Sequence, residues 1–332
     1  MTEQDDPLSR ALAWAESGKA PALATVVKTW GSSPRQPGSV MAVAPDGAFE
    51  GSVSGGCIEG AVIEEAMDAI ESGRARIAEF GATNEMAWQV GLACGGQVRV
   101  LIAPAPDATS LRKLVRAKPA ALVTEIATGK HAVVDRESAA GSLSLGAAQL
   151  AKVRALIAAD RSAYVDEGET LFAAVANPPL KLVVVGAVHI AQSLVPIARE
   201  AGFGVTVVDP RGAFATEARF PGVAKSAAWP DEALADIGID TRTAVVALSH
   251  DPKIDDPALI AALKSDAFYV GALGSKKNHE KRLGRLAGAG FAADELARIH
   301  GPVGLDLGGK SPSDIALAIV AQMVQVKNRG GA

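Results

Sequence analysis

The segment that begins at Leu182 constrains the fold of this chain more than any other. Leu182-Val183-Val184-Val185 is an uninterrupted apolar run, which is typical of a parallel strand buried on both faces. The glycine turn Gly186-Ala187-Val188-His189 follows at once and leads into a helical stretch over 190–201. Three more apolar strands are expected over 205–208, 244–248 and 269–273, and the last two are each followed by a helical stretch. This alternation predicts a doubly wound, Rossmann-like parallel sheet with right-handed crossovers.

The first half of the chain has shorter elements and more turns, which indicates an α+β domain. Helices are expected over 8–18, 58–72, 111–115 and 147–159, and strands over 22–29, 39–44, 98–102, 121–128, 131–135 and 170–175. Asn177-Pro178-Pro179 then interrupts the pattern. We therefore expect an α/β protein with an N-terminal α+β domain over 1–177 and a Rossmann-like domain over 180–332, which ends in a helix over 313–326.

Composition narrows the class of protein. Of the 332 residues, 48% are hydrophobic and 21% are charged, as in soluble globular proteins. A net charge of −4 and only 4% aromatic residues argue against a nucleic-acid partner. The acidic N-terminus is unlike a signal peptide, and no apolar run is long enough to span a membrane. With two cysteines and no disulfide framework, we expect a cytoplasmic protein.

The glycine turn of the Rossmann-like domain fits dinucleotide binding only in part. Gly186 matches the first glycine of the fingerprint, and Asp209 lies about 20 residues on, where an acid would hold a ribose. Val188, however, occupies the position of the second glycine, where the backbone approaches the pyrophosphate. This valine argues against ordinary NAD binding. An NAD(P)-dependent oxidoreductase remains the alternative function, and a Rossmann scaffold used for packing or for another ligand remains open.

Other polar residues lie at predicted strand ends, where ligands of open α/β sheets bind. Gly274-Ser275-Lys276 ends a strand and starts a helix, so its amides and its lysine could hold a phosphate. Ser275 could equally be a plain helix cap with solvated lysines beside it. His189 and His250 are candidates for a ligand or phosphate, although capping or surface roles are common for such histidines. Arg35 suits phosphate or carboxylate recognition but could be an ordinary surface residue.

Each of the two cysteines lies beside a pair of glycines, in Gly55-Gly56-Cys57 and in Cys94-Gly95-Gly96. Glycine lets a ligand approach the backbone closely, and free amides can cradle an anion. Cys57 is placed near a helix start, where the dipole favours the reactive thiolate. Glu59 is either a proton carrier for sulfur chemistry or a first-turn acid that complements the helix dipole. An inert buried thiol is the alternative for both cysteines, and no spacing matches a closed zinc site.

Taken in order, the motifs resemble the XdhC/CoxI family of maturation factors for molybdenum hydroxylases. They are Gly31-Ser32-Ser33-Pro34-Arg35, Gly51-Ser52-Val53-Ser54-Gly55-Gly56-Cys57-Ile58-Glu59, Cys94-Gly95-Gly96, Val208-Asp209-Pro210-Arg211, His250-Asp251, Gly271-Ala272-Leu273-Gly274-Ser275-Lys276-Lys277 and Ser313-Asp314-Ile315-Ala316. Gly55-Gly56-Cys57 is closer to the CoxI-like branch. One departure is Gly186-Ala187-Val188-His189, where the family commonly has Gly-x-Gly-His, and it puts nucleotide binding at this turn in doubt.

The resemblance implies a chaperone rather than an enzyme. Such proteins bind the molybdenum cofactor, as molybdopterin or its dinucleotide form, and protect it while a cysteine desulfurase replaces an oxo ligand by sulfide. They then help to deliver it to an apo-enzyme of the xanthine, aldehyde or carbon monoxide dehydrogenase type. A homodimer is compatible with this plan. A structural scaffold that bridges desulfurase and target, with no ligand of its own, is the third class of function.

Together with this resemblance, the paired Cys-Gly-Gly contexts lead to the hypothesis that Cys57 and Cys94 ligate the molybdenum or hold sulfur near it, with Glu59 as a partner in this chemistry. The implied cofactor-binding residues are Ser33, Arg35, Gly55, Gly56, Cys57, Cys94, Gly95, Gly96, Gly186, His189, Asp209, Arg211, His250, Gly274, Ser275 and Lys276.

Overall fold

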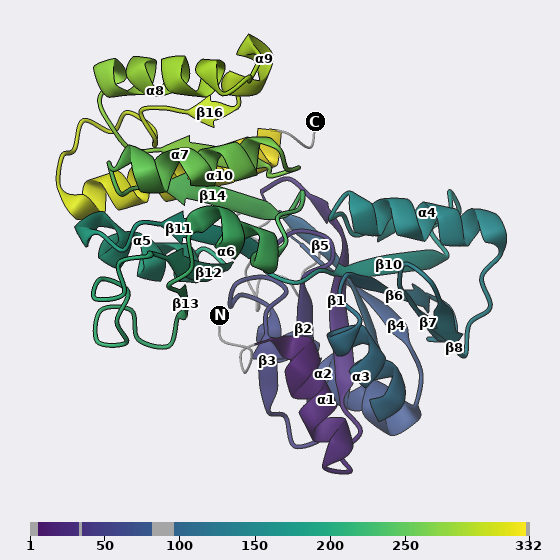
Figure 1. Cartoon of the computed structure of the whole chain (residues 1–332). Coiled ribbons are helices and arrows are strands. Elements are labelled where there is room, and N and C mark those ends of the chain that lie inside the picture. The colour runs from purple at the N-terminus through teal and green to yellow at the C-terminus, as the bar shows by residue number, and fades with distance from the viewer. Residues whose placement is uncertain (1–5, 33–34, 82–95, 330–332) are drawn as a thin grey trace. The chain divides into compact units, whose positions relative to one another are not determined.

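The computed structural model describes residues 6–32, 35–81 and 96–329. Contacts divide the chain into two compact units, Met1–Pro178 and Pro179–Ala332. The first unit combines helices with antiparallel sheets, and the second carries one parallel sheet (Figure 1). The predicted fold class is therefore confirmed. Within the described residues, no helix combines the length and the apolar character that a membrane crossing needs.

The N-terminal unit contains two five-stranded antiparallel sheets. Sheet A has the order β3-β2-β1-β5-β4 and consists of β3 (Phe49–Gly51), β2 (Val40–Val43), β1 (Ala22–Trp30), β5 (Gln97–Pro104) and β4 (Arg76–Phe80). Sheet B has the order β8-β7-β6-β10-β9 and consists of β8 (Ala139–Gly141), β7 (His131–Val134), β6 (Ala120–Glu125), β10 (Leu171–Ala176) and β9 (Ala163–Tyr164).

The two sheets pack face to face between two helices, because their strands are apolar on both faces. In β1, Ala24 and Val26 face helix α2 (Glu59–Ser72), whereas Leu23 faces sheet B. Helix α4 (Ala147–Ala158) covers the outer face of sheet B. Helices α1 (Pro7–Glu16) and α3 (Ala108–Arg116) complete the core between the sheets. The N-terminal unit is thus layered helix, sheet, sheet, helix.

The C-terminal unit is built on sheet C, a six-stranded parallel sheet with the order β13-β12-β11-β14-β15-β16. Its strands are β13 (Ala224–Ser226), β12 (Phe203–Val208), β11 (Leu180–Val185), β14 (Thr243–Ala247), β15 (Tyr269–Ala272) and β16 (Ile299–His300). Numbered along the chain this is 3-2-1-4-5-6, the order of a dinucleotide-binding sheet. The strand order reverses between β11 and β14, and ligands of such sheets bind outside that point.

Helices cover both faces of sheet C, which explains the apolar run in β11. Leu182 and Val184 face α5 (His189–Glu200) and α10 (Pro312–Arg329), and Val183 and Val185 face the opposite layer. That layer consists of α6 (Pro230–Ile237), α7 (Pro252–Leu263), α8 (Lys276–Gly288) and the short α9 (Ala293–Leu296). Helix α7 packs against β14 (Figure 1).

Several element boundaries differ from those expected from the sequence. Strand β6 ends at Glu125 rather than at Thr128, because the chain turns back there and Gly129 donates its amide to the Glu125 carbonyl. Pro196 lies inside α5 without ending it. Short elements were missed, among them the strands β4, β8, β9, β13 and β16 and the helices α6 and α9, because segments of two to eight residues leave little periodic pattern.

Candidate functional site

Three connections of the N-terminal unit leave sheet A at the same end. Strand β1 ends at Trp30, which pairs with Gln97, the first residue of β5. Strand β4 ends beside it at Phe80, and β3 ends at Gly51 opposite Met41. The connections that leave this end are 31–39, 52–58 and 81–96. They carry every site residue that the sequence predicted in this unit except Glu59, which begins α2.

The carboxylate of Glu59 organises the loop over 52–58. Although it carries a charge, its side chain is buried, with 7% of the residue exposed. Ser52 and Ser54 donate their hydroxyls to it at 2.6 and 2.5 Å. The backbone amides that donate to it, at 2.9 to 3.2 Å, are those of Val53, Ser54, Gly55, Gly56 and Ile58. The loop therefore wraps around a carboxylate of its own chain.

The glycine pair makes this wrapping possible. Gly55 and Gly56 have φ of +84° and +115°, the left-handed region that side chains disfavour. In this conformation both amides turn inward to Glu59. The sequence predicted an anion held by these amides, and the anion in the structure is the side chain of Glu59. A ligand at this loop must therefore bind through groups other than these two amides.

These hydrogen bonds decide the charge of Glu59. Burial alone would raise its pKa, but the hydroxyls of Ser52 and Ser54 and the loop amides outweigh burial and lower the pKa to about 2. The group is ionised at neutral pH and holds no proton to transfer. Of the two interpretations of Glu59 from the sequence, the geometry favours neither proton transfer nor a simple dipole effect. It makes Glu59 the residue that holds the loop in shape.

Cys57 is an exposed residue of this loop and forms no disulfide among the residues that the structure describes. Its amide donates to the Ser54 hydroxyl at 3.0 Å, which fixes the backbone beneath the thiol. Arg35 reaches the same loop, with its Nε donating to the Ser52 carbonyl at 3.1 Å. Gly96 is buried and immediately precedes β5. Ser33, Cys94 and Gly95 lie outside the described residues.

Because Cys57 is exposed, we expect its thiol to react with a reagent while the protein is folded. In the Cys94→Ala background, whose only thiol is Cys57, we expect one equivalent of thiol to react with a disulfide reagent under native conditions. Absorbance of the released thiolate measures both the rate and the amount. The rate should stay within about tenfold of that in denaturant, because the residue is exposed among the described parts of the chain. Labelling that appears only after unfolding would contradict the placement of Cys57.

The second group of predicted residues lies at the carboxyl edge of sheet C. Asp209, at the end of β12, has no exposed surface. Its Oδ2 accepts from the amide of Ala187 at 2.8 Å, and both its oxygens accept from the Arg211 guanidinium, at 2.9 and 2.8 Å. Oδ1 also accepts from the Arg211 amide. The carboxylate is therefore engaged in holding the glycine turn, and a ribose would have to displace these bonds.

The remaining residues of this edge surround the point where the strand order reverses. Gly186 has φ +100°, and a Cβ there would lie 2.8 Å from the Ser249 amide, so the turn is pressed against the end of β14. His189 is exposed at the first position of α5, and His250 is exposed with a left-handed φ of +62°. Ser275 caps α8 by accepting from the Asn278 amide.

Two buried charged residues at this edge, Asp255 and Arg282, escaped prediction from the sequence. Asp255 on α7 is 2% exposed and accepts from the amide and the hydroxyl of Ser249, at 3.1 and 2.7 Å. Arg282 on α8 is 5% exposed and lies 3.8 Å from Asp255. A charged residue in an otherwise amphipathic helix leaves no local signal that it is buried, so only the packing of α7 and α8 reveals this pair.

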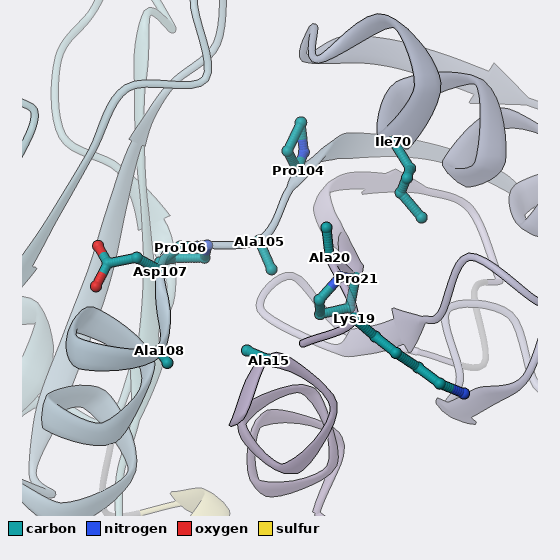
Figure 2. Close-up of a pocket in the computed structure, with 10 residues that line it drawn as sticks. All are labelled: Ala15, Lys19, Ala20, Pro21, Ile70, Pro104, Ala105, Pro106, Asp107 and Ala108. Atoms are coloured by element: carbon teal, nitrogen blue, oxygen red, sulfur yellow. The ribbon is translucent and has the colours of Figure 1, made fainter. Parts of the chain in front are cut away.

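A cavity of about 240 Å³ lies in the N-terminal unit (Figure 2). It is lined by the end of α1 and by Pro21 and Pro104, which lie at the opposite end of sheet A from the three connections. Its lining is mostly alanine and proline, and the Asp107 carboxylate beside it caps α3. Lys19 pairs with Asp46. Few polar groups converge there, so this cavity is poorly suited to an anionic ligand.

Comparison with known proteins identifies the family. A family model described as the XdhC Rossmann domain matches residues 182–323, and one described as the XdhC and CoxI family matches residues 14–81. A protein of Escherichia coli (strain K12) named molybdenum cofactor insertion chaperone PaoD is 30% identical over 312 residues, which cover 94% of this chain and 85% of the relative. The chain belongs to the XdhC/CoxI family.

Two further proteins are similar to this chain over most of its length. A Bacillus subtilis (strain 168) protein, named as a probable xanthine dehydrogenase subunit, is 25% identical over 92% of this chain and 93% of its own length. A solved structure from Bacillus halodurans, titled a xanthine dehydrogenase, superposes with a TM-score of 0.79 at 24% identity, covering 98% of this chain and 96% of that one. The resemblance read from the motifs is therefore confirmed, and Val188 does not remove the chain from the family.

Proposed function

We propose that this protein is a chaperone that binds the molybdenum cofactor as cargo and passes it to the apo-form of a molybdenum hydroxylase. The observation that carries the proposal is Cys57, an exposed thiol on a loop that Glu59 holds in shape. Thiolate is a soft ligand suited to transition metals and to sulfur chemistry. The name of the PaoD relative, a molybdenum cofactor insertion chaperone, supports the same cargo.

The finer steps of this function are also proposals. A cysteine desulfurase would exchange an oxo ligand of the bound cofactor for sulfide while the chaperone shields it. Delivery would go to an enzyme of the xanthine, aldehyde or carbon monoxide dehydrogenase type. In this scheme the protein is an accessory factor and not an enzyme, acts in the cytoplasm, and belongs to the CoxI-like branch, as Gly55-Gly56-Cys57 suggests.

The residues at the end of sheet A suit a sulfur-rich, anionic cargo in part. Cys57 would contact the metal or its sulfur, and Arg35, whose Nε donates to the Ser52 carbonyl, brings a positive charge to the same loop. Cys94, with Gly95 and Gly96, stays a predicted second contact. At the edge of sheet C, the residues predicted to hold the phosphate or nucleotide part are Gly186, His189, Asp209, Arg211, His250, Gly274, Ser275 and Lys276.

Asp209 bears on the alternative, an NAD(P)-dependent oxidoreductase. Its carboxylate is engaged with Ala187 and Arg211 rather than directed outward. Val188, half-buried against the core beside α5, occupies the position where a dinucleotide needs glycine. No observation on the described part of this chain favours the oxidoreductase over the chaperone.

The proposal is tested by the amount of cofactor that the protein carries. The full chain is co-expressed with cofactor biosynthesis as wild type, Cys57→Ala, Cys94→Ala and the double variant, and bound molybdenum and pterin are measured after purification. We expect Cys57→Ala to lower cofactor content about ten- to a hundredfold, as loss of groups around a metal does. Ser72→Ala, an equally small truncation at the exposed end of α2, is the matched control.

Transfer to a client completes the test. Activation of an apo-hydroxylase by each purified protein should follow its cofactor content. Wild-type cofactor content and wild-type activation in the double cysteine variant would overturn the role of the thiols. Wild-type protein without molybdenum or pterin, but with saturable NADH binding and turnover, would favour the oxidoreductase instead. Wild-type protein that binds neither ligand would favour a scaffold.

A further inference from the structure

The amino terminus of α8 presents backbone hydrogen-bond donors at the carboxyl edge of sheet C. Helix α8 begins at Lys276, four residues after β15 ends. The Ser275 hydroxyl accepts from the Asn278 amide at 3.3 Å. The amides of Lys276 and Lys277, the first two of the helix, have no acceptor within it. The positive end of the helix dipole is directed outward at the same place.

Arg282 adds a buried positive charge directly behind this turn. Only 5% of the residue is exposed, and its Nη2 donates to the Leu273 carbonyl at 2.7 Å. Its Nε and Nη1 have no hydrogen-bond partner among the residues that the structure describes. Helical side chains lean toward the helix N-terminus, and this one reaches Gly274: its Nη2 and Nη1 lie 3.8 and 4.0 Å from the position that a Gly274 Cβ would take.

The neighbouring carboxylate compensates this charge only in part. Asp255 Oδ2 lies 3.8 Å from Arg282 Nη2, within ion-pair distance but without a hydrogen bond. Asp255 Oδ1 is held by Ser249 instead. Burial raises the pKa of Asp255 and lowers the pKa of Arg282, as expected for two groups that stabilise each other incompletely. A buried guanidinium with two free donors calls for another anion.

We propose that the turn between β15 and α8 binds a phosphate group, with the amides of Lys276 and Lys277 and the Lys276 ammonium on the solvent side and Arg282 beneath. Helix N-termini bind phosphate through backbone amides, and the planar guanidinium matches two phosphate oxygens. Gly274, at φ +142°, lets the backbone between the two sets of donors approach the anion. The inference rests on the proposed function only in naming the phosphate of molybdopterin or of its dinucleotide form as the natural ligand.

The test measures phosphate binding to the purified full chain by calorimetry at constant ionic strength. The probes are inorganic phosphate, pyrophosphate, adenosine monophosphate and adenosine. We expect saturable binding of the three phosphate-bearing probes and none of adenosine. Arg282→Met should weaken binding about tenfold or more, as loss of charge-assisted hydrogen bonds does. Lys276→Glu, a change on an exposed residue that preserves folding, should do the same.

Lys281→Glu is the matched control, because it makes the same charge change at an exposed position of the same helix. It should leave binding unchanged. Absence of saturable binding to the wild type, or equal losses in the Lys276 and Lys281 variants, would overturn the inference. If Arg282→Met does not fold, the Lys276 comparison decides. Tighter binding of the nucleotide than of pyrophosphate would support a nucleoside phosphate as ligand, and the reverse order would support a bare phosphate group.

The same preparations keep this inference separate from the proposed function. A wild type that carries molybdenum cofactor but binds no phosphate probe at α8 overturns the inference alone. A wild type that binds the probes but never carries cofactor overturns the chaperone function alone.

Discussion

Glu59→Gln is expected to destabilise the N-terminal unit by about 3 kcal/mol at pH 7, because the pKa of Glu59 falls from an ordinary 4.5 to about 2 on folding. Glutamine keeps the shape of the side chain but turns one acceptor into a donor. That donor would face amides and hydroxyls that themselves need an acceptor. The loss should appear as a lower urea midpoint and as faster hydrogen exchange in residues 52–58.

The same substitution should change how stability depends on pH. Since folding lowers the pKa of Glu59, its contribution is complete above about pH 4.5 and is lost as the pH falls toward about 2. The difference between wild type and Glu59→Gln should therefore shrink over that interval. Glu64→Gln, which neutralises an exposed acid on the same helix, should show neither effect. If the free energies of unfolding of the wild type and of Glu59→Gln differ by the same amount at pH 3 and at pH 7, the ionised Glu59 carboxylate does not stabilise the folded protein as we expect.

Asp209→Asn is expected to destabilise the C-terminal unit by about 3 kcal/mol, at the lower end for a broken buried ion pair because the Arg211 side chain is 36% exposed and can be rehydrated. Asparagine would direct its amide group at either the Ala187 amide or the Arg211 guanidinium, both of which are donors. The pKa of Asp209, which burial alone would raise, is lowered by the bonds from Arg211 and Ala187.

The effect should be localised as well as large. Hydrogen exchange should accelerate at the glycine turn from 186 to 188 and at the start of α5, because Asp209 joins β12 to that turn. Urea denaturation measures the total loss. Asp231→Asn, at an exposed position in the first turn of α6, is the control and should shift stability by less than about 0.5 kcal/mol. A loss that small for Asp209→Asn would show that the carboxylate is not holding the turn.

Local pattern was enough to predict the Rossmann-like unit. The apolar run over 182–185 and the glycine at 186 both reflect backbone requirements that act within a few residues: burial on both faces of a parallel strand, and a left-handed φ. The ordered motifs indicated the family for the same reason, because each motif is a short local pattern in the sequence. The short strands β8 and β13 could not be found, because their formation depends on a neighbouring strand rather than on their own three residues.

The sequence singled out some residues of the two candidate sites and missed the roles of others. Cys57 and Arg35 were proposed separately from their motifs, and the structure brings them to one loop through the Ser52 carbonyl. The role of Glu59 was missed, because nothing in Gly55-Gly56-Cys57 tells whether the amides face a ligand or the chain itself. Asp255 and Arg282 were missed because each lies on a helix whose exposed face also carries charges.

Sequence alone was enough to predict the fold class and the family, since these depend on periodicity, glycine positions and motif order. Only the tertiary structure decided how the residues of the two candidate sites are used: the amides of Gly55 and Gly56 hold Glu59, Asp209 holds the turn at Ala187, and Arg282 lies buried behind Gly274. The reason is physical. The hydrogen-bond partner of a buried charge depends on which segment the fold brings within about 3 Å of it. The residues next to it in the sequence do not determine that partner.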